Sequence, residues 1–317
     1  MSQHALHLHL DAYINVREAL GFQMRAERTL LRDFVHFVET HSATGPIRAQ
    51  CAVDWACASP ARRGTGGAAQ RLSMARGFLI YLRSMMPDTE VPASGLVASF
   101  RRPKPYLLTP QHIQALIQAA QQIGSQGALQ PSPFSTVIGL MASTGLRVGE
   151  TLRLTMGDVQ LDHAPPLLHI RETKFHKSRF VPLHPTTAEQ LRHYLTMRSA
   201  RHADTLSDVC FVLENGQALT HKALGQSFAQ LCRQLGLWPT DGGRRPSPHA
   251  LRHAFAIERI RRWHHEGADV QTLLPRLSVY LGHVRPQESY WYLTATPELL
   301  TAAAARFQHY AARGDAS

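Results

Sequence analysis

Residues 281–293 read "LGHVRPQESYWYL", a Gly-His pair followed by two tyrosines that flank a tryptophan. Tyr292 lies nine positions after His283, so in one straight helix of 3.6 residues per turn the two side chains would face opposite ways. Pro286 bars an unbroken helix, which lets a second short helix turn one tyrosine back toward the histidine. Tyr290 and Tyr292 are two positions apart, about 200° on a helix, so only one of them can point into a shared site.

A second polar segment, "STGLRVGETLRL", spans residues 143–154. Gly145 allows a sharp turn, and Arg147 then stands at the start of the helix that follows. A guanidinium there adds its donors to a helix N-terminus, which already favours anions. Alone, an arginine at the start of a helix is most often a surface residue.

A third segment, "SPHALRHAFAIERI", spans residues 247–260. His249 and Arg252 are three apart and therefore share one helix face, and Pro248 fits the first turn, which places both near the N-terminal end. We expect His253 to point elsewhere, packing in the interior or capping a loop. A His-x-x-Arg pattern is common and by itself says little.

A β-hairpin is predicted between these segments. The stretches "PLLHIRE" (166–172) and "SRFVPL" (178–183) carry alternating or β-branched residues on either side of "TKFHK" (173–177). The remaining patterns of the second half are helical, from "TTAEQLRHYLTMRSA" to a final "TPELLTAAAARFQHYA". The fold class that follows is mainly α with a small antiparallel β-sheet, and a doubly wound α/β sheet is excluded.

The charge balance favours a polyanionic partner. The 317 residues contain 34 Lys and Arg against 23 Asp and Glu, a formal charge of +11 with the histidines neutral. This excess argues against an acidic protein or a neutral substrate as partner, although a merely basic housekeeping protein would show it too. The 44% of hydrophobic residues supports buried cores, and the length suits two domains.

The cysteines and histidines do not predict a metal site or a disulfide framework. The four cysteines are few and irregularly spaced, and reduced, mostly buried thiols are expected. His264 and His265 are adjacent, do not share a helix face, and belong to no H-E-x-x-H pattern. No apolar run follows a basic N-terminal segment and none is long enough to cross a bilayer, so we expect a cytoplasmic protein with no membrane partner.

The first third of the chain is predicted to be helical. Residues 12–41 carry a broad apolar stripe, 59–70 break regular structure, and 71–86 form a second strong helix. The segment "VASFRRPKPYLLT" (97–109) is basic and rich in proline, which favours an extended connector that either lies along a DNA backbone or is simply solvated. A new helix begins sharply after it, with Thr109 as N-cap and Pro110 at the first helical position.

Together, "TGLRVGE", "HALRH", "LGH" and a tyrosine nine residues past that histidine resemble the tyrosine recombinase family of phage integrases and Xer-type enzymes. The resemblance covers about residues 107–310, in matching order and rough spacing. It implies a two-domain architecture: a helical core-binding, DNA-binding domain (1–100), a basic linker (101–108) and a mixed α/β catalytic integrase domain with a C-terminal helix (109–317). The ending "YWYLTATPELL" is similar to integrases of transposons and other mobile elements.

The resemblance also implies a catalytic set, which by number is Arg147, Lys174, His249, Arg252, His283 and Tyr292. Tyr292, not Tyr290, would be the nucleophile, because the family's tyrosine lies nine residues past the Gly-His histidine. The family's lysine lies in the hairpin turn, where Lys174 matches better by position and Lys177 remains the alternative. Ser289 stands where the family often has threonine, three residues before the tyrosine, and keeps the hydroxyl.

These residue types suit the displacement of a phosphodiester. Two guanidiniums offer planar, permanently charged donors to the non-bridging oxygens, so neither a metal nor a cofactor is implied. A phenol has a pKa near 10 and needs help in losing its proton, which His249 would give, while Lys174 would protonate the 5′ oxygen that leaves.

The implied activity is site-specific DNA recombination. Duplex DNA would be cut and rejoined through a 3′-phosphotyrosyl intermediate without ATP, by protomers that associate on a specific recombination site as a tetramer. The C-terminal helix would dock on a neighbouring protomer or fold back on its own domain. The alternatives are a nicking-closing enzyme like the type IB topoisomerases and a DNA-binding relative that has lost catalysis.

Overall fold

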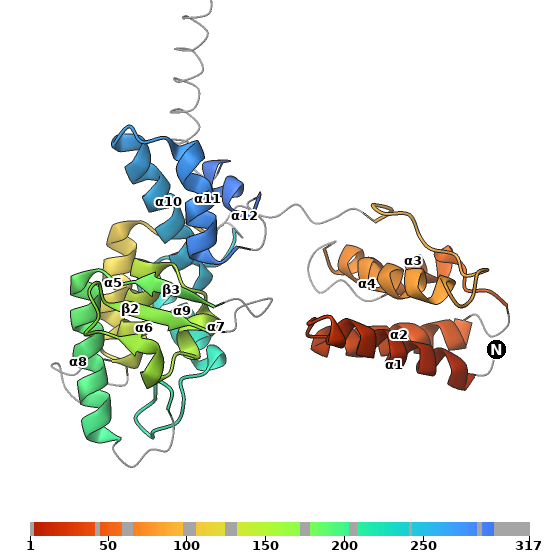
Figure 1. Ribbon diagram of the computed structural model, residues 1–317, viewed down its shortest axis with the longest axis horizontal. Coiled ribbons are helices and arrows are strands. Elements are labelled where there is room, and N and C mark those ends of the chain that lie inside the picture. The colour runs from red at the N-terminus through yellow and green to blue at the C-terminus, as the bar shows by residue number, and fades with distance from the viewer. Residues whose placement is uncertain are drawn as a thin grey trace, which may run out of the picture. The chain divides into compact units, whose positions relative to one another are not determined.

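The computed structural model divides the chain into two compact units, Met1–Pro103 and Lys104–Ser317. Each unit is described by itself (Figure 1). The structure describes residues 3–41, 45–58, 66–97, 106–123, 132–171, 178–202, 208–240, 243–283 and 287–294.

The first unit is helical throughout its regular elements, which are α1 (Gln3–Ala19), α2 (Arg25–His41), α3 (Ala49–Ala58) and α4 (Gly66–Arg83). Its core is centred on Trp55 and Phe34, whose rings lie 4.9 Å apart and which are almost fully buried. The Trp55 indole N–H donates to Asp33 at 2.9 Å, so this large ring is buried without losing its polar partner. These helices therefore enclose an apolar core of their own.

The predicted single helix over residues 12–41 was wrong. The chain forms α1 and α2 instead, and between them Gly21 adopts φ 84°, a left-handed conformation that ends the first helix. Leu20 and Phe22, expected in the apolar stripe, lie exposed in this turn. The spacing of apolar residues alone did not predict the interruption between α1 and α2.

The region after α2 also differs from the prediction. Residues 49–58 form α3, which the sequence analysis did not predict, and α4 begins at Gly66, inside the segment expected to be a loop. The predicted strong helix is present, with Leu72, Phe78, Leu79 and Leu82 buried. Small residues can therefore continue a helix here because its apolar face packs against α2 and α3.

The second unit carries a longer list of elements. They are α5 (Pro110–Ala120), α6 (Pro133–Thr144), α7 (Val148–Leu152), η1 (Met156–Asp158), β1 (Val159–Gln160), β2 (Leu167–Ile170), β3 (Arg179–Pro182), α8 (Pro185–Arg201), α9 (His221–Gln234), α10 (His249–His265), α11 (Val270–Leu281), α12 (Gln287–Tyr290) and η2 (Trp291–Thr294). The predicted class, mainly helical with a small antiparallel sheet, is confirmed.

The sheet has the order β1-β2-β3, and both strand pairs are antiparallel. In the predicted hairpin, Leu167 pairs with Pro182 and Ile170 with Arg179. Residues 172–177, the segment that carries both lysines and was predicted to form the hairpin turn, lie outside the described part of the chain. The register nevertheless fixes Arg179 as the first residue of the returning strand.

The start of α5 follows the prediction. Thr109 is the N-cap, its hydroxyl accepts a hydrogen bond from the His112 backbone N–H at 3.2 Å, and Pro110 occupies the first helical position. The basic part of the predicted linker, 98–105, lies outside the described residues, as does the predicted final helix over 296–311.

The second unit has two apolar clusters. The larger one surrounds α6, whose Val137 and Met141 are fully buried, and reaches the sheet, α8 and α9. A smaller cluster joins α10, α11 and η2 through Ile260, Leu274 and Tyr292. Figure 1 shows α10, α11 and α12 together in blue. The segment with the candidate nucleophile is thus packed against α10 and α11.

The four cysteines are free, and three of them are buried, namely Cys51, Cys210 and Cys232. Among the described helices, none combines the length and apolar character that a membrane span requires.

Candidate active site

The turn between α6 and α7 positions Arg147. Gly145 ends α6 in the left-handed region at φ 66°, and its N–H donates to the Met141 carbonyl at 2.9 Å. Arg147 then takes the N-cap position of α7, as predicted. From there its guanidinium reaches the Gly282 carbonyl at 2.8 Å.

Glu150 holds Arg147 from the first turn of α7. One carboxylate oxygen accepts from the Arg147 backbone N–H at 3.0 Å, and the other accepts from its guanidinium at 2.9 Å. Arg179 of β3 binds both oxygens of the same carboxylate, at 3.1 and 2.9 Å. Burial would raise the pKa of Glu150, but the bonds and charges of Arg179 and Arg147 outweigh it and lower the pKa to about 2. Glu150 is therefore an anion at neutral pH, held between two cations.

Arg252 lies on the first turn of α10 and is 1% exposed. Its two terminal nitrogens donate to the carbonyls of Gly145 and Leu281, each at 2.8 Å. Burial, together with the Arg147 charge, lowers the pKa of Arg252 to about 10, while the Tyr292 hydroxyl opposes the shift. The group stays charged at neutral pH, and its neighbours include both the other arginine and the candidate nucleophile.

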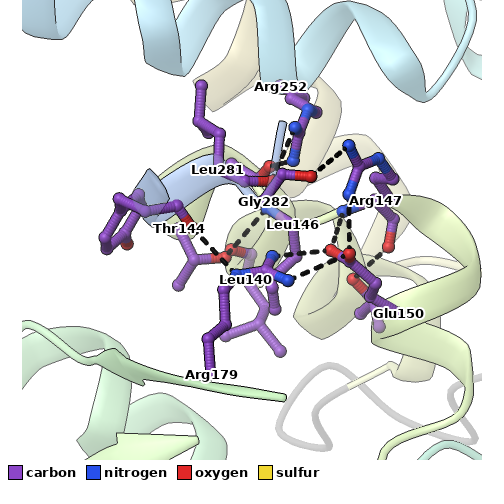
Figure 2. Close-up of polar contacts among 12 residues, drawn as sticks. Leu140, Thr144, Leu146, Arg147, Glu150, Arg179, Arg252, Leu281 and Gly282 are labelled. Carbon is purple, nitrogen blue, oxygen red and sulfur yellow. Dashed lines mark hydrogen bonds and ion pairs between the residues drawn. The ribbon is translucent and has the colours of Figure 1, made fainter. Parts of the chain in front are cut away.

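Three guanidiniums meet at the C-terminal end of α11. The carbonyl of Tyr280 accepts from Arg179 at 2.9 Å, that of Leu281 from Arg252, and that of Gly282 from Arg147. Figure 2 shows the last two of these contacts together with the bonds to Glu150. The last carbonyls of a helix have no partner inside it and lie at the negative end of its dipole, so they suit cations. The end of α11 thus organises side chains from α7, β3 and α10.

His283 follows this helix end directly. Gly282 ends α11 at φ 67°, and the His283 backbone N–H donates to the Ser278 carbonyl at 2.9 Å. The His283 Nδ1 lies 2.7 Å from the Ser289 hydroxyl, so the serine that replaces the family's threonine supports this ring. The rings of His283 and Tyr292 stack with centroids 6.2 Å apart.

Tyr292 turns back toward the histidine, whereas Tyr290 does not. Tyr292 is 2% exposed within the smaller apolar cluster, and Tyr290 is 48% exposed. The expectation that only one tyrosine points into the site therefore agrees with the structure. The side chain of Trp291 is not among those described.

His253 was expected to point away from the site, but it lies next to Tyr292. It is buried as expected, but its Nδ1 faces the Tyr292 hydroxyl at 3.3 Å. Its ring also meets the ring of His249 edge-on, with centroids 4.5 Å apart. The two histidines, four positions apart on α10, therefore connect the exposed His249 to the buried tyrosine.

The structure brings together five of the six predicted side chains, while Lys174 and its alternative Lys177 lie outside the described residues. The sequence analysis did not single out Glu150 and Arg179. The spacing of Glu150, three positions after Arg147, is that of a capping box and was a usable signal. Arg179 had no such signal, because only the strand register reveals its position.

Among the residues that the structure describes, no group of three or more His, Cys, Asp or Glu side chains is arranged to hold a metal ion.

Comparison with known proteins shows the family of this chain. The sequence profile of the phage integrase family matches residues 107–298. The integrase/recombinase candidate y4rB of Sinorhizobium fredii is 37% identical over 305 residues, 94% of this chain and 96% of the relative. The tyrosine recombinase XerC of Roseiflexus is 26% identical over 219 residues, 67% of this chain and 64% of the relative. The chain belongs to the phage integrase family, the tyrosine recombinases.

Two solved structures share the fold. The Tn1549 transposon integrase in complex with transposon right end DNA superposes with a TM-score of 0.66 at 16% identity, covering 96% of this chain and 99% of that one. The XerH site-specific recombinase bound to its palindromic difH substrate gives a TM-score of 0.64 at 19% identity, covering 86% and 77%. The resemblance seen in the sequence motifs is thereby confirmed at the level of family and fold.

Proposed function

We propose that this tyrosine recombinase cuts and rejoins duplex DNA at a specific site through a 3′-phosphotyrosyl intermediate formed by Tyr292. The observation that carries the proposal is the end of α11. There, Arg252 and Arg147 bind the carbonyls of successive residues, and His283 follows with its ring stacked beside Tyr292. A phosphodiester placed beside these groups would meet two guanidiniums, an imidazole and a phenol.

The two arginines would stabilise the charge that develops on the phosphate. Arg147 is partly exposed and Arg252 is buried, so Arg147 is the more accessible to substrate. Preorganised donors of this kind contribute roughly 3 kcal/mol each to the transition state. ATP is not required for rejoining, because the phosphotyrosyl bond conserves the energy of the broken linkage, and the guanidiniums would take the charge-stabilising role that a metal ion could otherwise fill.

Proton transfer would involve the imidazoles and a lysine. About one phenol in a thousand is ionised at neutral pH, so Tyr292 needs a base, and His249 with His253 forms a chain of imidazoles that ends at its hydroxyl. Attack requires this buried hydroxyl to exchange His253 for the phosphate. Lys174 would protonate the leaving 5′ oxygen, with Lys177 as the alternative.

A sulfur leaving group tests the role of the lysine. We expect Lys174→Ala to slow cleavage of an ordinary phosphodiester and to recover on a substrate with a bridging 5′ phosphorothiolate, because a thiolate leaves without a proton. Lys177→Ala is the matched control and should show no such recovery. Recovery confined to Lys177→Ala would assign the acid to that residue.

The partner would be duplex DNA carrying a recombination site. The relatives with solved structures are described as DNA complexes, one of them with a transposon end, which supports DNA binding and a mobile-element origin for this chain. The formal charge of +11 agrees with such a partner. Residues 1–100 would bind DNA as the core-binding domain, 101–108 would link the domains, and four protomers would assemble on the site. The cytoplasmic location stays a prediction.

Trapping the covalent intermediate tests the proposal. Synthetic duplexes tiled across the DNA that adjoins the gene, each nicked so that the released fragment diffuses away, should yield a protein–DNA adduct that survives denaturation. Tyr292→Phe should abolish the adduct, and Tyr290→Phe, the exposed neighbour, should retain it. An adduct without strand exchange would favour the topoisomerase-like alternative. The absence of an adduct despite specific binding would favour a catalytically inactive relative.

A further inference from the structure

Arg179 is a third guanidinium in the site, and no step of the proposed chemistry uses it. It lies on β3, binds both oxygens of Glu150, and donates its Nε proton to the Tyr280 carbonyl at 2.9 Å. Its side chain is 13% exposed. All three of its nitrogens are therefore engaged by protein acceptors, which leaves Arg179 poorly placed to bind a phosphate itself.

The contacts of Arg179 converge on the same groups that hold Arg147. Glu150 accepts from both arginines, and the carbonyls of Tyr280 and Gly282 at the end of α11 accept one bond from each. In Figure 2 the Glu150 carboxylate lies between the two guanidiniums. Any movement of Arg179 would therefore shift both the carboxylate and the helix end that orient Arg147.

The packing over Gly282 shows how tight this arrangement is. A Cβ atom at residue 282 would lie 2.8 Å from Nη1 of Arg179 and 3.4 Å from Nη1 of Arg147. The two guanidiniums thus pass side by side over a residue that has no side chain. Without the buried anion of Glu150 they would repel each other, so the three groups form one interdependent unit.

We propose that Arg179 is a positioning residue, which holds Glu150 and the end of α11 in place and thereby keeps Arg147 aimed at the scissile phosphate. This inference rests on the proposed function. The alternative is that Arg179 acts on the lysine, because β3 follows the segment that contains Lys174 and Lys177. The geometry points to Arg147, since among the described residues the bonds of Arg179 go to the Glu150 carboxylate and to the Tyr280 carbonyl of α11.

The test compares Arg179→Gln with Arg147→Ala and with Arg192→Gln on nicked duplexes. Arg192, on α8, binds the Leu161 carbonyl and touches none of these groups, so it is the matched control. Each duplex is made with an ordinary phosphodiester, with an uncharged methylphosphonate, or with a bridging 5′ phosphorothiolate at the cleavage position. Single-turnover cleavage, DNA affinity and thermal unfolding are measured for every variant.

We expect Arg179→Gln to cleave the phosphodiester roughly 10- to 100-fold more slowly, the loss typical of an outer residue that orients a reacting one, with DNA affinity nearly unchanged. The methylphosphonate lacks the charge that Arg147 neutralises. The defects of Arg179→Gln and Arg147→Ala should therefore shrink together on that substrate. Glu150→Gln should show the same pattern of defects as Arg179→Gln. If the two residues act together on Arg147, the double variant should cleave no more slowly than the slower of the two single variants.

Other results would overturn the inference. An equal defect on both substrates would assign Arg179 a purely structural role, and recovery on the phosphorothiolate would assign it to the lysine. If Arg179→Gln cleaved the phosphodiester at the wild-type rate, Arg179 would have no role in positioning Arg147. Should Arg179→Gln not fold, Arg179→Lys, which keeps the charge and one bond, is put through the same comparison. A wild-type protein that forms no adduct on any duplex would contradict the proposed function, on which this inference rests, whereas the results above would overturn this inference alone.

Discussion

Arg252 carries a permanent charge into the interior of the second unit, where its two terminal nitrogens are bound by the carbonyls of Gly145 and Leu281. Burying a cation costs several kcal/mol, and neutral acceptors offset this only in part. The carbonyls come from the loop that carries Arg147 and from the helix end that precedes His283. The same bonds that satisfy the charge thus tie together the two segments on which the proposed chemistry depends.

Replacing Arg252 should separate catalysis from binding. We expect Arg252→Ala to abolish adduct formation while most DNA affinity remains, because many phosphate contacts share the binding energy. The two carbonyls left without a donor should lower the free energy of unfolding by about 1–3 kcal/mol each. Adduct yield, equilibrium binding and urea unfolding are measured together. A collapse of affinity in a folded variant would contradict the catalytic role.

Glu150 should make stability depend on pH in the acid range. Its pKa is lowered from the ordinary value of 4.5 to about 2, so the native state is stabilised above pH 4.5 and loses that stabilisation as pH falls toward 2. A shift of this size corresponds to about 3 kcal/mol. Glu150→Gln cannot titrate, so the difference in unfolding free energy between wild type and variant should shrink by about that amount over the window. If the difference in unfolding free energy between wild type and Glu150→Gln stayed the same at every pH, the carboxylate would not be held by the two arginines.

At the scale of elements, two left-handed glycines end the helices that frame the site. Gly145 ends α6 and Gly282 ends α11, with φ of 66° and 67°. A Cβ atom at Gly145 would lie 2.5 Å from Phe255 Cδ1, and one at Gly282 would meet the arginines. Gly236 has φ 67° but nothing within 4 Å, so it isolates the cost of the backbone conformation.

Alanine at these three glycines should therefore give three different results. Gly236→Ala should cost roughly 1–2 kcal/mol of stability, the cost of the left-handed conformation alone. Gly145→Ala should add about 1–3 kcal/mol for overpacking against Phe255. Gly282→Ala should resemble Gly236→Ala in stability, because the flexible guanidiniums of Arg179 and Arg147 can move away from the added Cβ. It should lose most cleavage activity, because Arg147 would then no longer point at the phosphate. Urea unfolding and single-turnover cleavage measure this, and equal cleavage by Gly236→Ala and Gly282→Ala would contradict it.

Several elements could be predicted because their signals are local. Thr109 and Pro110 are a cap and a first helical residue wherever they occur together, and the strands on either side of the hairpin turn carry their own pattern. The break after His283 was predicted from Pro286 alone. The motifs also singled out Arg147, Arg252 and Tyr292 as candidate site residues, because the order of the motifs along the chain is characteristic of the family.

The parts that could not be predicted depend on contacts between distant segments. The turn at Gly21 is hidden inside a continuous apolar pattern, and α3 is built largely from small residues that periodicity does not resolve. The contact between His253 and Tyr292 joins positions 39 apart, and that between Arg179 and Tyr280 joins positions 101 apart. No spacing rule within one helix or strand reports on such pairs.

At the scale of the whole molecule, two units with separate cores are joined by a segment that contains Arg101, Arg102 and Lys104. Separate cores mean that each unit can be stable without burying surface against the other. If both grip one duplex, the second contact forms at the high effective concentration that a short connection imposes. The formal charge of +11 would be shared between two DNA contacts in this arrangement.

Cleaving the segment between the two units should show whether they bind one DNA duplex together. A protease site inserted between residues 98 and 105 leaves the described elements of both units intact, and the uncut insertion variant serves as the control. After cleavage we expect affinity for a cognate duplex to fall by about 10²- to 10⁴-fold, because each unit then binds with its own affinity alone. The salt dependence should weaken as well, since each separated unit neutralises fewer phosphates than the intact chain. An affinity unchanged by cleavage would mean that one unit supplies all the binding, and residues 1–100 would then need a role other than holding DNA.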